Sequence, residues 1–208
     1  MEIIPYASRT GTLKNLDSLR RMGWRMLVSA TGRLRTEDFD HYALDNGAWT
    51  AYQKGKPIDL DLFTKALRML GKDADWAVLP DIVAGGEKSL ELSLKWMRTV
   101  LDECQMGMLS VQDGMTVDMV RELVGPRVGI FIGGSTAWKL ETIDQWAELG
   151  RERNAWCHVA RVNSPLRIRK CQRAGATSFD GTNASRFSKN HPKLNCAIRQ
   201  QTLDFDRK

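Results

Sequence analysis

Several side chains that can do acid–base or nucleophilic chemistry stand at the ends of short apolar runs. Asp45, Asp81 and Asp180 each close such a run. Other runs end in an amide, a glycine pair and an arginine: Gln112, Gly133–Gly134 and Arg161. Two carboxylates can cleave a glycosidic bond, because one attacks the anomeric carbon while the other moves protons. The pattern therefore favours chemistry on a glycosidic bond.

Each of these residues also has a structural interpretation. Asp-Asn-Gly at 45–47 and Asp-Gly at 180–181 are turn sequences, and Asp81 could cap a following helix. His158 competes as an acid–base group, but its place inside the apolar run 156–162 favours a histidine packed within a strand. As a group, these residues favour a functional site more strongly than any one of them does, because they follow successive apolar runs along the chain.

The elements that must position these side chains alternate between strand and helix patterns. Eight β-rich apolar runs predict strands at 3–7, 25–29, 42–45, 76–81, 107–112, 128–133, 155–162 and 177–180. Apolar residues at three- and four-residue steps predict helices at 13–22, 60–70, 89–103, 117–124, 139–151 and 165–173. Alternating strands and helices imply a parallel sheet with right-handed crossovers.

Eight strands favour an α/β fold of the compact (β/α)8 TIM-barrel type, with a doubly wound open sheet as the alternative. In both architectures, ligands bind at the carboxyl ends of the strands, where the candidate residues stand. Residues 30–41 show no helical pattern and are expected to form a loop. No linker or repeat divides the chain, so residues 1–208 are expected to form a single domain.

Composition narrows the class of protein. A hydrophobic content of 42% with 27% charged residues is ordinary for a globular protein and excludes a disordered chain. No apolar run approaches the ~20 residues of a membrane span, and no leader pattern opens the chain. Four cysteines without a C-x-x-C pair are expected to be free thiols in a reducing cytoplasm, with no metal site.

The formal net charge of +6 is unevenly distributed. Residues 151–208 carry 13 Lys or Arg against 4 Asp or Glu, whereas the first 150 residues carry 18 against 21. A basic C-terminal segment on a near-neutral body indicates either a polyanion contact or a solvated basic surface.

Five short segments occur in the order of motifs found in the tRNA-guanine transglycosylases. Segments 43–49, 111–114, 132–135, 159–165 and 179–186 resemble T-D-S-G-G-F/Y, V-Q-G-G, I-G-G-L, L-M-G-V-G-T-P and F-D-C-V-x-P-T-R of that superfamily. Asp81 stands where the family has a base-binding aspartate. The resemblance favours the barrel over the open sheet.

The resemblance also implies a role for each matched residue. Asp180 would be the nucleophile that attacks C1′ of a guanosine unit, and Asp45 the general acid/base that deprotonates the incoming base. The residues that would bind the base are Asp81, Gln112, Gly133, Gly134 and Trp49, and those that would contact nucleic acid are Arg161, Arg186 and Lys189. Trp49 would stack on the base, although packing in the core is an equally good interpretation. Exchange of one purine for another needs no ATP, metal or other cofactor.

Two departures from the family pattern bear on the substrate. The chain lacks the C-x-C-x-x-C…H zinc motif of the tRNA-modifying enzymes, and Arg161 stands where their motif has a glycine. With its short length, the chain looks more like the small DpdA-like branch that inserts 7-deazaguanines into DNA. DNA is therefore the expected polymer and tRNA the second choice, with free guanine or a 7-deazaguanine as the other substrate and accessory proteins as further partners.

Two other functions stay open. A non-catalytic barrel could bind nucleic acid through its basic segment alone. A metabolic barrel enzyme could act on a small phosphorylated sugar, with Ser8–Arg9 or Gly133–Gly134 holding the phosphate.

Overall fold

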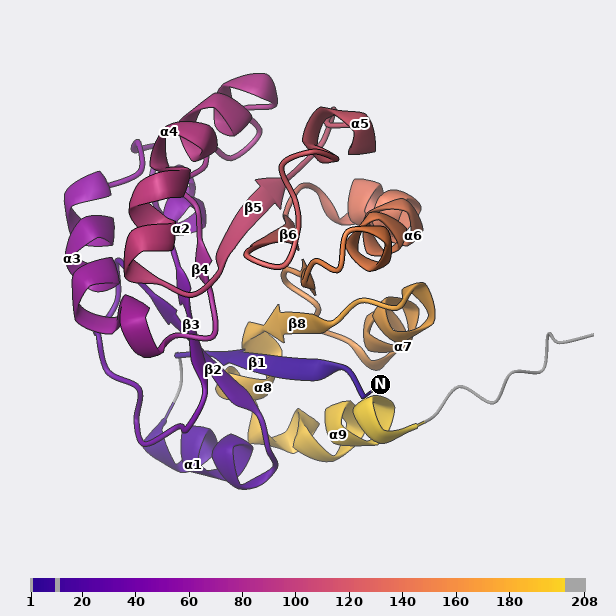
Figure 1. Cartoon of the computed structure of the whole chain (residues 1–208). Helices are drawn as coiled ribbons and strands as arrows, with labels where there is room; N and C mark the ends of the chain where they lie inside the picture. The colour runs from indigo at the N-terminus through magenta and orange to yellow at the C-terminus, as the bar shows by residue number, and fades with distance from the viewer. Residues whose placement is uncertain (1, 10–11, 201–208) are drawn as a thin grey trace, which may run out of the picture.

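The computed structural model describes residues 2–9 and 12–200, and its strands form one closed parallel barrel in sequence order. Figure 1 shows β1 beside β8, where Tyr6 is in register with Asp180. The strands are β1 Ile4–Ser8, β2 Arg25–Ser29, β3 Tyr42–Asp45, β4 Ala77–Val78, β5 Gly107–Val111, β6 Val128–Ile132, β7 Cys157–Val159 and β8 Ser178–Gly181. The predicted (β/α)8 barrel is confirmed, and the open doubly wound sheet is wrong.

Helices surround the barrel (Figure 1). They are α1 Leu13–Arg21, α2 Ala48–Gln53, α3 Leu60–Leu70, α4 Glu87–Glu103, α5 Val117–Val120, α6 Thr136–Glu152, α7 Pro165–Ala174, α8 Thr182–Arg186 and α9 His191–Arg199, with 3-10 turns η1 Gly71–Asp73 and η2 Ser188–Asn190. All six predicted helices are present, although α5 ends four residues early. Three helices were not predicted, namely α2, α8 and α9. The helices α2 and α8 have only one or two turns, which show too little periodicity.

The ends of α7 illustrate how local sequence sets these boundaries. Pro165 occupies the first turn, and the Ser164 side chain caps the helix. Gly175 ends it with a left-handed backbone at φ +83°. Gly71 follows α3 but has φ −62°, so it is not a left-handed cap. A side chain there would lie 2.8 Å from the Glu103 carbonyl, and this close approach requires glycine.

The barrel has an outer and an inner core. The outer core packs strand residues against the helices, whereas the inner core fills the barrel with Tyr6, Leu27, Ala43, Trp76, Val78 and Met108. Side chains alternate between the two faces of a strand. Asp45 lies two residues beyond Ala43, and Ser110 lies two beyond Met108. These polar residues therefore continue the inner face at the carboxyl end, which we call the mouth.

The segment between β2 and β3 has no helix or strand, as predicted for residues 30–41. It contains two residues with left-handed backbone, Glu37 and Asp38, at φ 49° and 59°. It also carries two exposed arginines, Arg33 and Arg35, to the mouth side of β2. This loop forms one side of the mouth.

All four cysteines are free thiols, three of them buried. Over residues 2–9 and 12–200, no helix combines the length and apolar character needed to cross a membrane.

Candidate active site at the barrel mouth

The closed barrel brings the three predicted aspartates to the same end. Asp45 is the last residue of β3, Asp180 lies near the end of β8, and Asp81 follows β4. They are close enough to interact, because the negative charges of Asp180 and Asp81 both raise the pKa of Asp45. The mouth therefore holds a group of coupled carboxylates.

Asp180 is held through one of its two carboxylate oxygens. The backbone N–H of Arg161 donates to Oδ1 at 3.1 Å, and Nε2 of His158 lies 3.1 Å from the same oxygen. Its other oxygen, Oδ2, makes no hydrogen bond or ion pair within the described residues. The Asp180 side chain is 8% exposed, so its position is fixed while Oδ2 has no hydrogen-bond partner among the described residues.

A chain of hydrogen bonds sets the orientation of the His158 ring. Trp156 Nε1 donates to the Ser178 hydroxyl at 2.6 Å, and that hydroxyl lies 2.8 Å from His158 Nδ1. Burial lowers the pKa of His158, with the Asp180 charge opposing this effect, and favours a neutral ring. Because the Asp180 carboxylate only accepts, we assign the ring proton to Nε2 and the acceptor role to Nδ1. This chain of hydrogen bonds, which we call the relay, therefore directs the Nε2–H donor of His158 at Asp180.

Aromatic rings close the barrel around His158. Phe131 stacks on its ring with centroids 5.0 Å apart, and Trp76 and Tyr6 pack at 4.8 and 5.7 Å. His158 has no exposed surface. It is packed within its strand, as the structural interpretation predicted, and also contacts Asp180.

Asp45 is partly exposed in the mouth, and its environment disfavours the charged form. Burial raises its pKa to about 6, with a further contribution from the charge of Asp180. The Ser29 hydroxyl and the Gly47 backbone N–H oppose this by stabilising the carboxylate. A carboxyl group with such a pKa can both take up and release a proton near neutral pH.

Asp81 is bound by amide groups rather than by cations. Asn46 Nδ2 donates to its Oδ1 at 2.7 Å, and Gln112 Nε2 approaches its Oδ2 at 3.4 Å. Burial raises the pKa of Asp81. The interpretation of Asp81 as a helix cap is wrong, because α4 begins only at Glu87. Asn46 was not predicted as a site residue, although it follows Asp45 directly in the sequence.

The Gln112 amide nitrogen is shared among three acceptors. Besides Asp81, it lies 2.8 Å from the Ser89 hydroxyl and 3.0 Å from the Ile82 carbonyl. Gln112 therefore fixes the loop between β4 and α4, which is a structural role. Its side-chain oxygen makes no hydrogen bond within the described residues.

Arg161 crosses part of the mouth from the end of β7. Its guanidinium donates to the Gly134 carbonyl and lies over the Trp49 ring, 4.2 Å from the ring centre. Trp49 is 38% exposed, so the interpretation of this side chain as core is wrong. Arg161 has φ +59°, a conformation that favours glycine. Its predicted contact with nucleic acid stays a prediction.

The Gly133–Gly134 pair has a clear packing reason. Gly134 has φ +61°, and a side chain there would lie 2.6 Å from the Asp113 carboxylate. That carboxylate instead accepts from the backbone and hydroxyl of Ser135, both at 2.6 Å. The pair thus shapes the β6 end of the mouth, and its predicted contact with a base stays a prediction.

Lys139 is a charged residue that the sequence reasoning missed. It is 4% exposed, its ammonium donates to the Ala160 carbonyl, and burial lowers its pKa to about 8. This bond fixes the backbone just before Arg161. A lysine four residues before buried Ile143, on the apolar face of α6, is the signal that could have identified it.

Arg186 and Lys189 lie apart from the carboxylates, in the last turn of α8 and in η2. Both are exposed, and neither side chain forms a hydrogen bond or ion pair with the described residues. Their contact with nucleic acid stays a prediction.

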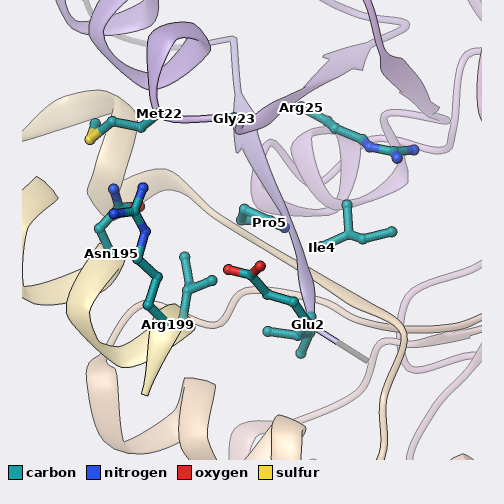
Figure 2. Close-up of a pocket in the computed structure, with 10 residues that line it drawn as sticks. Glu2, Ile4, Pro5, Met22, Gly23, Arg25, Asn195 and Arg199 are labelled. Carbon is teal, nitrogen blue, oxygen red and sulfur yellow. The ribbon is translucent and has the colours of Figure 1, made fainter. Parts of the chain in front are cut away.

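Two cavities among the described residues lie at opposite ends of the barrel. A cavity of about 210 Å³ adjoins Asp45 at the mouth. A larger one, about 320 Å³, lies at the starts of β1 and β2 beside α9, and Figure 2 shows Glu2, Asn195 and Arg199 around it. The larger cavity contains none of the predicted site residues, so we place the candidate site at the mouth.

Comparison of the sequence with models of protein families found no match, and comparison with curated proteins found none either. The transglycosylase resemblance therefore rests on the short motifs alone. Within the part of the chain that the structure describes, no three His, Cys, Asp or Glu side chains converge as a metal site.

Proposed function

We propose that this protein is a nucleic-acid guanine transglycosylase, which exchanges guanine in DNA for a 7-deazaguanine base through a covalent intermediate. The observation that carries the proposal is the state of Asp180. Its carboxylate is fixed through Oδ1 by His158 and Arg161, while Oδ2 is uncommitted within the described residues. A nucleophile needs this combination of a fixed position and a free lone pair.

In the first half-reaction, Asp180 forms a bond to C1′ of the target nucleotide. The C1′–N9 bond breaks, its electron pair goes to the purine, and the purine takes a proton from Asp45. In the second half-reaction, Asp45 removes the proton from N9 of the incoming base, which attacks C1′ and releases Asp180. The raised pKa of Asp45, about 6, suits a group that gives and takes one proton per cycle.

The rest of the mouth supplies groups for a purine. Asp81 and the side-chain oxygen of Gln112 offer acceptors, and Trp49 offers an aromatic face that Arg161 covers. Stacking on such a face is worth roughly 1–3 kcal/mol per base. A guanine must leave the duplex to reach a barrel mouth, so the enzyme must flip it out or act on single strands.

The test is transfer of label. The full chain is incubated with radiolabelled guanine or a 7-deazaguanine base, together with duplex DNA, single-stranded DNA or tRNA, and label in the polymer is counted. We expect label in DNA, and loss of at least about 10³-fold in Asp180→Asn. The matched control is Asp144→Asn, which removes an exposed carboxylate on α6 and should leave transfer unchanged.

Denaturing electrophoresis adds a second readout. Wild-type protein should form an adduct with DNA that survives denaturation, and Asp180→Asn should not. Full transfer in Asp180→Asn would overturn the mechanism. Label in tRNA alone would overturn the choice of DNA. Binding of nucleic acid without transfer, unaffected by loss of Asp45 and Asp180, would indicate a non-catalytic binding barrel instead.

A further inference from the structure

The cavity beside Asp45 is lined by groups that the exchange reaction does not use. It lies between the ends of β1 and β2, the 30–41 loop and the start of α2. Two arginines and four hydroxyl-bearing residues line it: Arg9, Arg33, Ser8, Ser29, Thr31 and Thr50. Guanidinium and hydroxyl groups are the side-chain donors that bind tetrahedral oxyanions best.

Arg9, one of the residues that line the cavity, has an unsatisfied buried donor. Its guanidinium pairs with Glu37 through a terminal nitrogen, but its Nε is buried and has no hydrogen-bond partner in the described part of the chain. A buried donor without a partner is costly, and a ligand that accepts from it would remove that cost. Arg9 therefore has a donor that the described residues leave unused.

Positive charge gathers around Arg9. Burial lowers its pKa, and the charges of Arg33 and Arg35 lower it further, so both of these arginines are close enough to repel Arg9. Glu37 is the one carboxylate that pairs with any of them in the described residues. An anion bound between Arg9 and Arg33, the two arginines that line the cavity, would relieve the repulsion between them.

We propose that this cavity is a phosphate-binding subsite. Its volume of about 210 Å³ is below the ~300–1,000 Å³ of sites for whole small ligands, so it fits one group of a larger substrate. Asp45 forms part of its wall. A phosphate here would lie beside the proposed acid/base, with its attached sugar toward Asp180. The site rests on these residues alone; its assignment to a nucleic-acid phosphate rests on the proposed function.

The experiment compares two neighbouring arginines of one loop. Arg33 lines the cavity and Arg35 does not, yet both are exposed and carry the same charge. Each is changed to alanine in the full-length Asp180→Asn protein, so that binding is measured without chemistry. Deoxyguanosine, deoxyguanosine 5′-monophosphate and a single-stranded deoxyoligonucleotide are titrated by calorimetry, with inorganic phosphate as competitor and thermal melting as a check on folding.

We expect the monophosphate to bind about tenfold more tightly than deoxyguanosine, and inorganic phosphate to reduce this difference. Arg33→Ala should remove most of the difference, whereas Arg35→Ala should preserve it. If both variants lose the affinity difference equally, the arginines act only through their overall positive charge, and the subsite is wrong. Equal binding of deoxyguanosine and its monophosphate by the unsubstituted site would also overturn the subsite.

The oligonucleotide identifies the source of the phosphate. If Arg33→Ala also weakens its binding about tenfold, the subsite holds a phosphate of the polymer. If only the monophosphate is affected, the subsite stands but serves a small phosphorylated ligand, and the nucleic-acid assignment is wrong. Failure of label transfer with intact phosphate binding would overturn the proposed function and leave the subsite in place.

Discussion

Carboxylates lie inside the barrel at both of its ends, and the two ends hold them differently. At the amino-terminal end, Asp75 accepts from the Tyr6 hydroxyl at 2.8 Å and pairs with Arg25 at 3.0 Å. His41 lies 3.1 Å from its other oxygen. Both oxygens are thus bound, and a permanent cation neutralises the charge. Such an arrangement stabilises a fold but leaves the carboxylate nothing to react with.

At the mouth, no lysine or arginine of the described residues forms an ion pair with Asp45, Asp81 or Asp180. Their partners are amides, hydroxyls, a backbone N–H and a neutral histidine. Burial raises the pKa of Asp45, and the negative charges of Asp180 and Asp81 add to this effect. Lys139 and Arg161 interact electrostatically with Asp180 but form no ion pair with it. The difference separates a carboxylate that maintains structure from the carboxylates that the proposed mechanism uses.

The largest effect on stability is expected from Asp75→Asn. This change removes the charge partner of partly buried Arg25 and should lower the free energy of unfolding by about 2–3 kcal/mol. Urea denaturation measures it, with Asp144→Asn as an exposed control on α6. An unchanged urea midpoint would show that Asp75 does not stabilise the fold, and the proposed contrast between the two ends of the barrel would be wrong.

Asp45→Asn should raise the free energy of unfolding at neutral pH, whereas Asp75→Asn should lower it. The folded protein holds the pKa of Asp45 at about 6, above the ordinary aspartate value of 3.8, so folding favours the protonated form. Its contribution to stability is complete below about pH 4 and is lost as the pH rises through about 6. The variant should therefore gain about 1–3 kcal/mol at pH 7 while exchange falls roughly 10²-fold or more.

Denaturation of both proteins at pH 4 and pH 7 tests this prediction. The gain should be present at pH 7 and absent at pH 4. A variant that is less stable than wild type at pH 7 would show that Asp45 is a structural carboxylate like Asp75.

A smaller effect is expected at His158. His158→Phe keeps a ring among Phe131 and Trp76 but removes one of the two hydrogen bonds to Asp180. We expect kcat for exchange to fall about tenfold with KM for the polymer unchanged, since His158 positions Asp180 without touching substrate. His158→Gln, which keeps an N–H donor, should recover part of the rate. Equal kcat in all three proteins would leave His158 with a packing role alone.

The strand ends at the mouth could be predicted where the hydrogen bonds between strands and the apolar run of the sequence end at the same residue. β2 and β3 match their predicted ranges, and β3 ends at Asp45. The apolar runs at 76–81 and 155–162 predicted strands that are longer than the observed β4 and β7. In both places, the chain leaves the sheet before its apolar residues end. In the second run, the left-handed backbone of Arg161 turns it away.

The partners of Asp180 could be predicted only in part. His158 was recognised as a candidate, but its relay through Ser178 depends on the register between β7 and β8, which no local pattern reveals. Lys139 and Asn46 reach their acceptors across elements distant in sequence. The exposure of Trp49 follows from α2, a helix too short to predict from periodicity.

The aromatic rings around His158 have a kinetic consequence. Tyr6, Trp76 and Phe131 fill the barrel beneath Asp180, so a molecule that enters the mouth must leave by the same opening. A departing base would block the arrival of the next. Steady-state exchange should therefore give parallel double-reciprocal lines for polymer and base, with each substrate inhibiting competitively when it binds the wrong form of the enzyme.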